Sequence, residues 1–112
     1  MNKYINVAKD FTAYPEGRTR NDSQQYSGQT FREDILVPAL NNNEYDKVIV
    51  DANEVSGTGS FFWEEIFGGL IRNKQVSYET IKSKLEFKCE PNKDLENRIW
   101  KYIDDANKIH KW

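Results

Sequence analysis

Three short segments of the chain have the hydrophobic pattern of β-strands. Residues 47–51 (KVIVD) form a compact β-branched run that is typical of a central, buried strand. Residues 4–8 (YINVA) are short and β-prone, and they predict a first strand. Residues 84–89 (KLEFKC) alternate apolar and charged side chains, which indicates a half-buried strand towards the edge of a sheet.

A first helix is predicted between the first two strands. It begins near Ser27 or at Thr30, where Thr30 and Glu33 have the spacing of a capping box. Pro38 lies inside the helical pattern and has no backbone N–H, so we expect a kink there. Three asparagines at 41–43 end the helix.

A second, very apolar helix is predicted over residues 61–72, with Ser60 as its N-cap. Gly68 and Gly69 are costly inside a helix, and we expect them to allow a close approach to a neighbouring backbone. A short helix follows over residues 78–83, capped by Ser77. A last helix follows Pro91 and Asn92, with an apolar stripe of Leu95, Ile99, Ile103 and Ala106.

The alternation of strands and helices predicts an α/β fold, with a mixed sheet of three to five strands and helices packed on it. The polar stretch over residues 9–27 contains a turn at Pro15–Gly17. It fits either a hairpin or a long ordered loop. At 112 residues the chain is the size of one domain, which we take to span residues 1–112.

Composition excludes several classes of protein. A net charge of −2 argues against a broad nucleic-acid-binding face. The chain has no apolar stretch of 18 residues and no signal-peptide pattern, so we expect neither a membrane span nor secretion. The single cysteine, Cys89, cannot form an internal disulfide, and a cytoplasmic location is expected.

Candidate chemistry centres on the strand-to-helix junction at residues 51–60. Its glycines suggest a phosphate cradle, but no lysine follows them, so the P-loop pattern fails. The segment is either a tight structural turn or a ligand or modification site.

The sequence contains few of the residue combinations that are typical of catalytic sites. His110 is the only histidine, Cys89 fits a core position, and Glu64 and Glu65 point about 100° apart on a helix. We therefore expect no catalytic residues, no metal and no cofactor.

Charged side chains offer two further candidates. Arg18 and Arg20 flank the predicted turn and could hold a carboxylate or a phosphate, or simply belong to a solvated loop. Residues 31–60 contain two basic and six acidic residues, a net charge of −4. An acidic face of this kind suits a basic partner surface, although it is also compatible with ordinary solubility.

Three segments resemble a known family. They are SGQTFREDILVPAL, VIVDANEVSGTGSFFWEEIFGGLIR and VSYETIKSKLEF. Together they look like the bacterial STAS-like domain family of uncharacterised function, and the resemblance covers residues 3–106. The turn Pro15-Glu16-Gly17-Arg18 is similar to a Pro-Gly-Gly-Arg turn of that family.

The family is in turn similar to STAS domains, which include anti-sigma-factor antagonists. The resemblance implies a site at the start of the helix after the central strand, where those antagonists carry a phosphorylatable serine. Here Phe61 stands at the acceptor position, with Ser60 before it. We therefore expect partner binding that does not depend on phosphorylation.

These features predict a non-enzymatic, regulatory protein-binding module that docks its partner through the loop and helix start. The predicted partner-binding residues are Gly57, Thr58, Gly59, Ser60, Phe61, Phe62, Glu64 and Glu65. The resemblance implies a histidine-kinase-like ATPase as partner, with the chain a monomer or weak homodimer. Alternatives are a small inhibitor encoded by a mobile element and acting through an acidic face, or a small nucleotide- or anion-binding protein that uses the GTGS turn.

Overall fold

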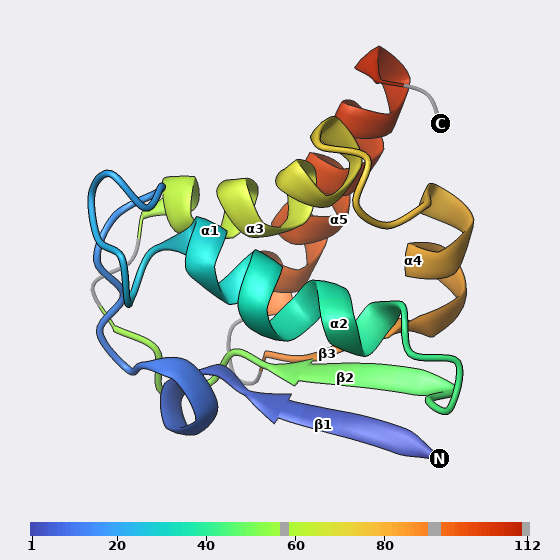
Figure 1. The fold of residues 1–112 in the computed structure, drawn as a ribbon, viewed down its shortest axis with the longest axis horizontal. Coiled ribbons are helices and arrows are strands. Elements are labelled where there is room, and N and C mark those ends of the chain that lie inside the picture. The colour runs from blue at the N-terminus through green and yellow to red at the C-terminus, as the bar shows by residue number, and fades with distance from the viewer. Residues whose placement is uncertain (57–58, 90–92, 111–112) are drawn as a thin grey trace.

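A computed structural model of the protein describes residues 1–56, 59–89 and 93–110 (Figure 1). Its sheet consists of β1 (Asn2–Asn6), β2 (Lys47–Asp51) and β3 (Leu85–Lys88), in the order β1-β2-β3. Both pairings are parallel, with Tyr4 opposite Ile49 and Val50 opposite Phe87. The predicted α/β class is confirmed, with β2 central and β3 at an edge; the sheet is parallel where the sequence suggested a mixed one.

The sheet is covered on one face. Val48 and Val50 of β2 are buried, whereas Lys47, Ile49 and Asp51 are only half-buried. Figure 1 shows why, because helices α1, α2, α3 and α5 lie on the same side of the sheet. The predicted central position of β2 is confirmed, and the strand is buried on the covered face of the sheet only.

The start of the chain differs from its prediction. β1 ends at Asn6 because the side chain of Asn6 accepts the N–H of Lys9 and caps a single π-helical turn, η1 (Val7–Phe11). The following residues, 12–27, form an ordered loop and no hairpin. Within it, the N–H of Glu16 donates to the carbonyl of Tyr26 at 2.9 Å, which folds the loop back on itself.

The first predicted helix is present but irregular. It runs through α1 (Gly28–Phe31), a π-helical turn η2 (Arg32–Leu36) and α2 (Val37–Leu40). Ser27 is its N-cap, which confirms the first of the two predicted starts, and the capping box predicted at Thr30 is not the start of the helix. The irregularity expected from Pro38 takes the form of η2, in which the N–H of Val37 reaches back five residues to the carbonyl of Arg32.

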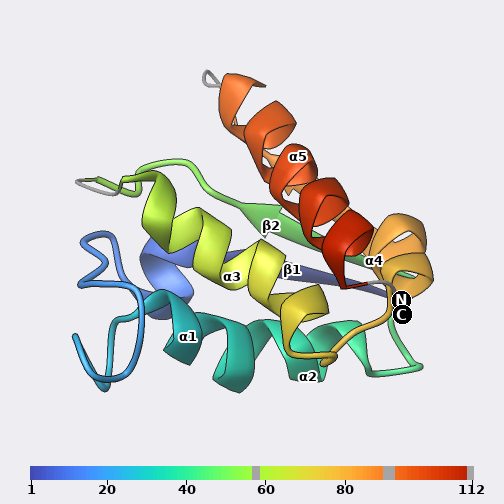
Figure 2. The same cartoon turned by 90° about the horizontal axis from the view of Figure 1, so that it is seen from above.

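The remaining helices follow the sequence pattern closely. They are α3 (Ser60–Arg72), α4 (Tyr78–Lys84), whose N-cap is Ser77 as expected, and α5 (Lys93–Ile109). Figure 2 shows α3 between α5 and the α1–α2 run. None of the helices formed by the described residues is both long and apolar enough to cross a membrane.

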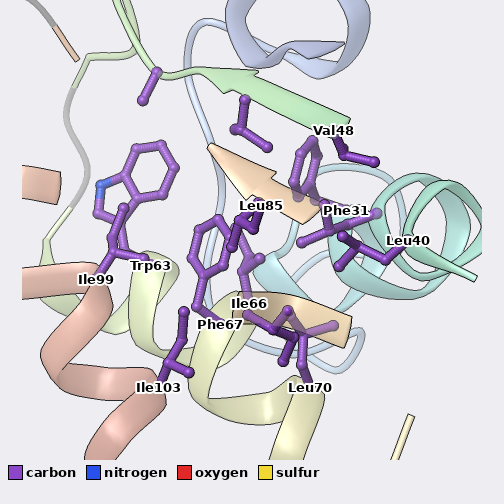
Figure 3. Packing of buried hydrophobic residues seen from close by; sticks show 14 of the residues in the cluster. Phe31, Leu40, Val48, Trp63, Ile66, Phe67, Leu70, Leu85, Ile99 and Ile103 are labelled. Atoms are coloured by element: carbon purple, nitrogen blue, oxygen red, sulfur yellow. The ribbon is translucent and has the colours of Figure 1, made fainter. Parts of the chain in front are cut away.

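The core lies between the sheet and these helices (Figure 3). Buried side chains of α3 pack against both α5 and the α1–α2 run. The predicted apolar stripe of α5 is buried as well. Members of this core include Phe31, Leu40, Val48, Ile66, Phe67, Leu70, Leu85, Ile99 and Ile103.

Candidate functional site

The candidate site is the start of α3, which follows β2 and its connecting loop. The N-cap of α3 is Gly59, and no side chain bonds to this end of the helix as a cap. Ser60 is already the first helical residue, so its predicted role as N-cap was wrong; an N-cap has extended backbone. The predicted site residues Gly57 and Thr58 lie outside the described residues.

Two adjacent aromatic rings in the first turn of α3 have opposite surroundings. The residue Phe61 is 66% exposed, whereas Phe62 is 4% exposed. The ring of Phe62 stacks on Phe11 and meets Trp63 edge to face, with centroids 6.5 and 4.9 Å away. Because successive helical side chains point about 100° apart, one turn directs one ring to the core and the next ring to the surface.

A pocket of about 410 Å³ opens beside Phe61. It lies between the first turn of α3 and the loop that precedes α1, and its lining residues are Pro15, Gly17, Arg18, Asp22, Gly59, Phe61 and Phe62. The guanidinium carbon of Arg18 lies 5.8 Å from the centre of the Phe61 ring, within the range of a cation–π contact. The pocket thus combines aromatic, charged and backbone groups.

Backbone hydrogen bonds hold the loop side of the pocket in place. The N–H of Gly28 donates to the carbonyl of Gly17 at 3.2 Å, which ties the loop to the start of α1. The carboxylate of Asp22 accepts the N–H groups of Thr19 and Arg18 at 3.1 and 3.0 Å. These two bonds lower the pKa of Asp22, which is therefore ionised at neutral pH.

The two predicted acidic residues are paired within the chain. Glu64 accepts Arg18 Nη2 at 2.7 Å and Arg72 Nη1 at 2.7 Å. Glu65 accepts Arg18 Nε at 2.9 Å and Arg32 Nη1 at 2.5 Å, and it is only 8% exposed. These carboxylates follow Phe61 by three and four positions, and their charges are compensated by arginines.

A buried arginine organises this side of α3. Arg32 is 2% exposed, and its Nη1 also donates to the carbonyl of Glu65 at 2.6 Å. Its Nε donates to Gln75 Oε1 at 2.8 Å and its Nη2 to Glu33 Oε2 at 3.1 Å. Each guanidinium nitrogen therefore has an acceptor, as burial of this charge requires.

Sequence reasoning did not single out Arg32, although a signal was present. Arg32 precedes Leu36 by four positions and Leu40 by eight, and both leucines are fully buried. A charged residue on the buried row of a helix requires a partner of opposite charge nearby. The pattern did not show which carboxylate that partner would be.

The glycines of α3 make room for side chains rather than for a neighbouring backbone. A Cβ on Gly69 would collide with the guanidinium group of Arg32. The close approach to a backbone occurs instead at Gly28, where a Cβ would lie 2.9 Å from the carbonyl oxygen of Phe62. The expected role of Gly68 and Gly69 is corrected accordingly.

The second candidate arginine of the loop, Arg20, also contacts the chain itself. Its guanidinium donates to Asp34 Oδ1 at 3.0 Å, to Thr30 Oγ1 at 3.1 Å and to Glu33 Oε1 at 3.3 Å. The hydrogen bond to Asp34 is the main reason that the pKa of Arg20 is raised. Arg18 and Arg20 therefore hold carboxylates of the chain itself, which belong to α3 and η2 respectively.

Two residues considered for catalysis lie away from the pocket. Burial raises the pKa of the Cys89 thiol to about 11, which keeps it protonated at neutral pH. His110 lies beyond the last residue of α5. Among the residues that the structure describes, no group of three or more His, Cys, Asp or Glu could hold a metal ion.

Comparison with known proteins gives one family. A family model described as a STAS-like domain of unknown function matches residues 27–94, more than half of the chain. Neither the curated proteins nor the solved structures that were searched gave a match. The matched segment contains Arg32, Glu65 and Gly69, the residues that join the α1–η2 run to α3. The chain belongs to the family of STAS-like domains of unknown function.

Proposed function

We propose that the protein is a non-enzymatic regulatory module that binds a protein partner through the start of α3. The docking surface consists of Gly59, Ser60 and Phe61 together with the pocket residues Pro15 and Asp22 of the loop. It keeps Gly59, Ser60 and Phe61 of the predicted residues and adds the preceding loop. Phe62, Glu64 and Glu65 are left out because the first is buried and the other two are paired with arginines.

Phe61 carries the proposal. The residue is two-thirds exposed and lies beside a pocket, in the first turn of the helix. Large aromatic side chains next to a pocket are the usual anchors of protein–protein interfaces. The ring of Phe61 fits this role, since the core does not need it.

The resemblance to anti-sigma-factor antagonists makes a histidine-kinase-like ATPase the first partner to test. The side chain at the position of their phosphoacceptor is here an aromatic ring without a hydroxyl group. We therefore propose that binding is constitutive and needs no phosphate.

A capture experiment with matched surface variants tests the docking surface. Wild-type protein, Phe61→Ser and Tyr4→Ser are immobilised and exposed to lysate of the native host, and the retained proteins are identified and then titrated in purified form. Tyr4 is the control because it is an equally exposed aromatic residue, 69%, on β1.

We expect wild type and Tyr4→Ser to retain the same partner and Phe61→Ser to lose it. Retention of that partner by Phe61→Ser would contradict the proposal. Mass spectrometry of the native protein tests the second part, since a phosphorylated Ser60 that is needed for binding would show that the interaction is gated.

A further inference from the structure

The charged residues that line the pocket beside Phe61 differ in whether the protein already neutralises them. It contains one cationic group, Arg18, and one anionic group, Asp22. Arg18 is held by two carboxylates, Glu64 at 2.7 Å and Glu65 at 2.9 Å. Its charge is therefore compensated before any ligand enters.

Asp22 has no such compensation. Its carboxylate accepts the backbone N–H groups of Arg18 and Thr19 and the side chain of Thr19, and no basic side chain of the described residues pairs with it. Glu16, between the lining residues Pro15 and Gly17, is also exposed, and its carboxylate accepts only the hydroxyl of Ser23 at 3.3 Å. The uncompensated charge at the mouth of the pocket is therefore negative.

The aromatic wall adds a second preference. The ring of Phe61 already lies within cation–π distance of the guanidinium group of Arg18. Most of the ring remains exposed, so it can contact a further side chain on its open surface. An aromatic face next to a carboxylate suits a long basic side chain, whose stem packs on the ring while its charge reaches the carboxylate.

We infer that the protein partner inserts a lysine or arginine side chain into this pocket, with its stem against Phe61 and its charge facing Asp22. This inference rests on the proposed function and specifies the chemistry of the segment that docks. An acidic segment would meet an Arg18 that Glu64 and Glu65 already neutralise, and it would face the carboxylate of Asp22.

Three pools of short synthetic peptides test the inference. The pools have the same length and the same apolar flanking residues, and they differ only in whether the central residue is basic, acidic or neutral. The fraction of each pool retained by the immobilised protein is measured at low and at high salt. The proteins are wild type, Phe61→Ser, Phe61→Leu, Asp22→Asn and Glu79→Gln, each checked first for its melting temperature.

The variants separate the contributions to binding. Asp22→Asn keeps an oxygen that can accept the loop N–H groups but removes the charge, and Phe61→Leu keeps an apolar surface but removes the aromatic ring. Glu79→Gln removes an exposed carboxylate from α4, on the opposite side of the molecule from the loop (Figures 1 and 2). It is the control for a general effect of net charge.

We expect wild type and Glu79→Gln to retain the basic pool about fivefold more strongly than the other two pools at low salt. This preference should fall in high salt, in Asp22→Asn and in Phe61→Leu. Equal or stronger retention of the acidic or neutral pool, or retention of no pool, would overturn the inference. Loss of every pool in Phe61→Ser would still support docking at this surface, whereas unchanged retention in Phe61→Ser would contradict the proposed function as well.

Discussion

Phe61 and Glu65 lie about one turn apart on α3, and they show two different uses of the same helix. Phe61 is 66% exposed, whereas Glu65 is 8% exposed and bound by two arginines. The two residues share a neighbour, Arg18, which contacts the ring of one and the carboxylate of the other. One residue is held by the fold, and the other stands on its surface.

The comparison separates structure from function within the family. The segments that carry the resemblance contain Arg32, Glu65 and Gly69. All three take part in the packing of α3 on the α1–η2 run. Their presence in the chain is explained without a ligand. At the start of α3 the exposed ring of Phe61 and the pocket next to it have no such role in the packing, and they carry the proposed docking surface.

The largest effect is expected on the buried side of this comparison. Arg32→Met should lower the free energy of unfolding by about 3–5 kcal/mol, because the buried carboxylate of Glu65 loses its closest cation. Urea denaturation measures the change. The double variant Arg32→Met/Glu65→Leu should recover much of the loss, since both buried charges are then absent. A single variant with wild-type stability would show that the ion pair does not hold α3.

Gly69 and Gly68 provide a matched pair of adjacent substitutions. Gly69→Ala should lower the free energy of unfolding by about 1–3 kcal/mol, because the methyl group collides with the buried guanidinium of Arg32. Gly68→Ala meets only the ends of the Glu64 and Arg72 side chains, which are partly exposed and can move. It should leave stability unchanged or raise it by up to about 1 kcal/mol. Thermal or urea melts that rank the two the other way would contradict the packing described.

The polar network also predicts how stability depends on pH. Burial alone would raise the pKa of Glu33, but hydrogen bonds from Gln75, Arg20, Arg32 and Gln29 lower it below its usual value of 4.5. Because the folded-state pKa is the lower one, this stabilisation is complete above about pH 4.5 and is lost as the pH falls through the folded-state pKa.

Glu33→Gln tests this dependence. The difference in free energy of unfolding between wild type and Glu33→Gln should be largest at neutral pH and should shrink below about pH 4.5. Urea melts across this range of pH measure it. A difference that stays constant from neutral to acidic pH would show that the ionised carboxylate does not contribute.

The smallest effect is expected at Ser60. Its predicted capping role was wrong, so Ser60→Ala should change the free energy of unfolding by less than about 0.5 kcal/mol. Loss of a true N-cap would cost about 1 kcal/mol. A denaturant melt therefore distinguishes the two roles directly.

The parts of the fold that sequence patterns predicted are those decided within a few residues. Examples are the β-branched run of β2, the end of α3 at Arg72, the N-cap Ser77 and the stripe of α5, which all depend on neighbours at short spacing. The open face of the sheet was not predicted, since a strand covered on one side and a strand covered on both can have the same apolar run.

The position of the candidate site is an expectation from the resemblance, and the contacts around it could not be predicted from the sequence. Phe61 was found because the resemblance placed a site at the start of α3. The pairing of Arg18 with Glu64 and Glu65 joins residues 46 and 47 positions apart, which no local pattern can show. The same holds for Arg32 and Glu65, which are 33 positions apart. Glu64 and Glu65 were therefore predicted to lie on a partner-binding surface, whereas their ion-pair partners are arginines of the same chain.

The claim that Phe61 serves a partner rather than the fold is tested most directly by one variant measured in two ways. The free energy of unfolding of Phe61→Ser should stay within about 0.5 kcal/mol of wild type, because the ring is exposed. Its affinity for the partner that wild type retains should fall at least about tenfold, as expected for an aromatic anchor. Unchanged affinity, or a large loss of stability, would contradict the assignment of Phe61 to the docking surface.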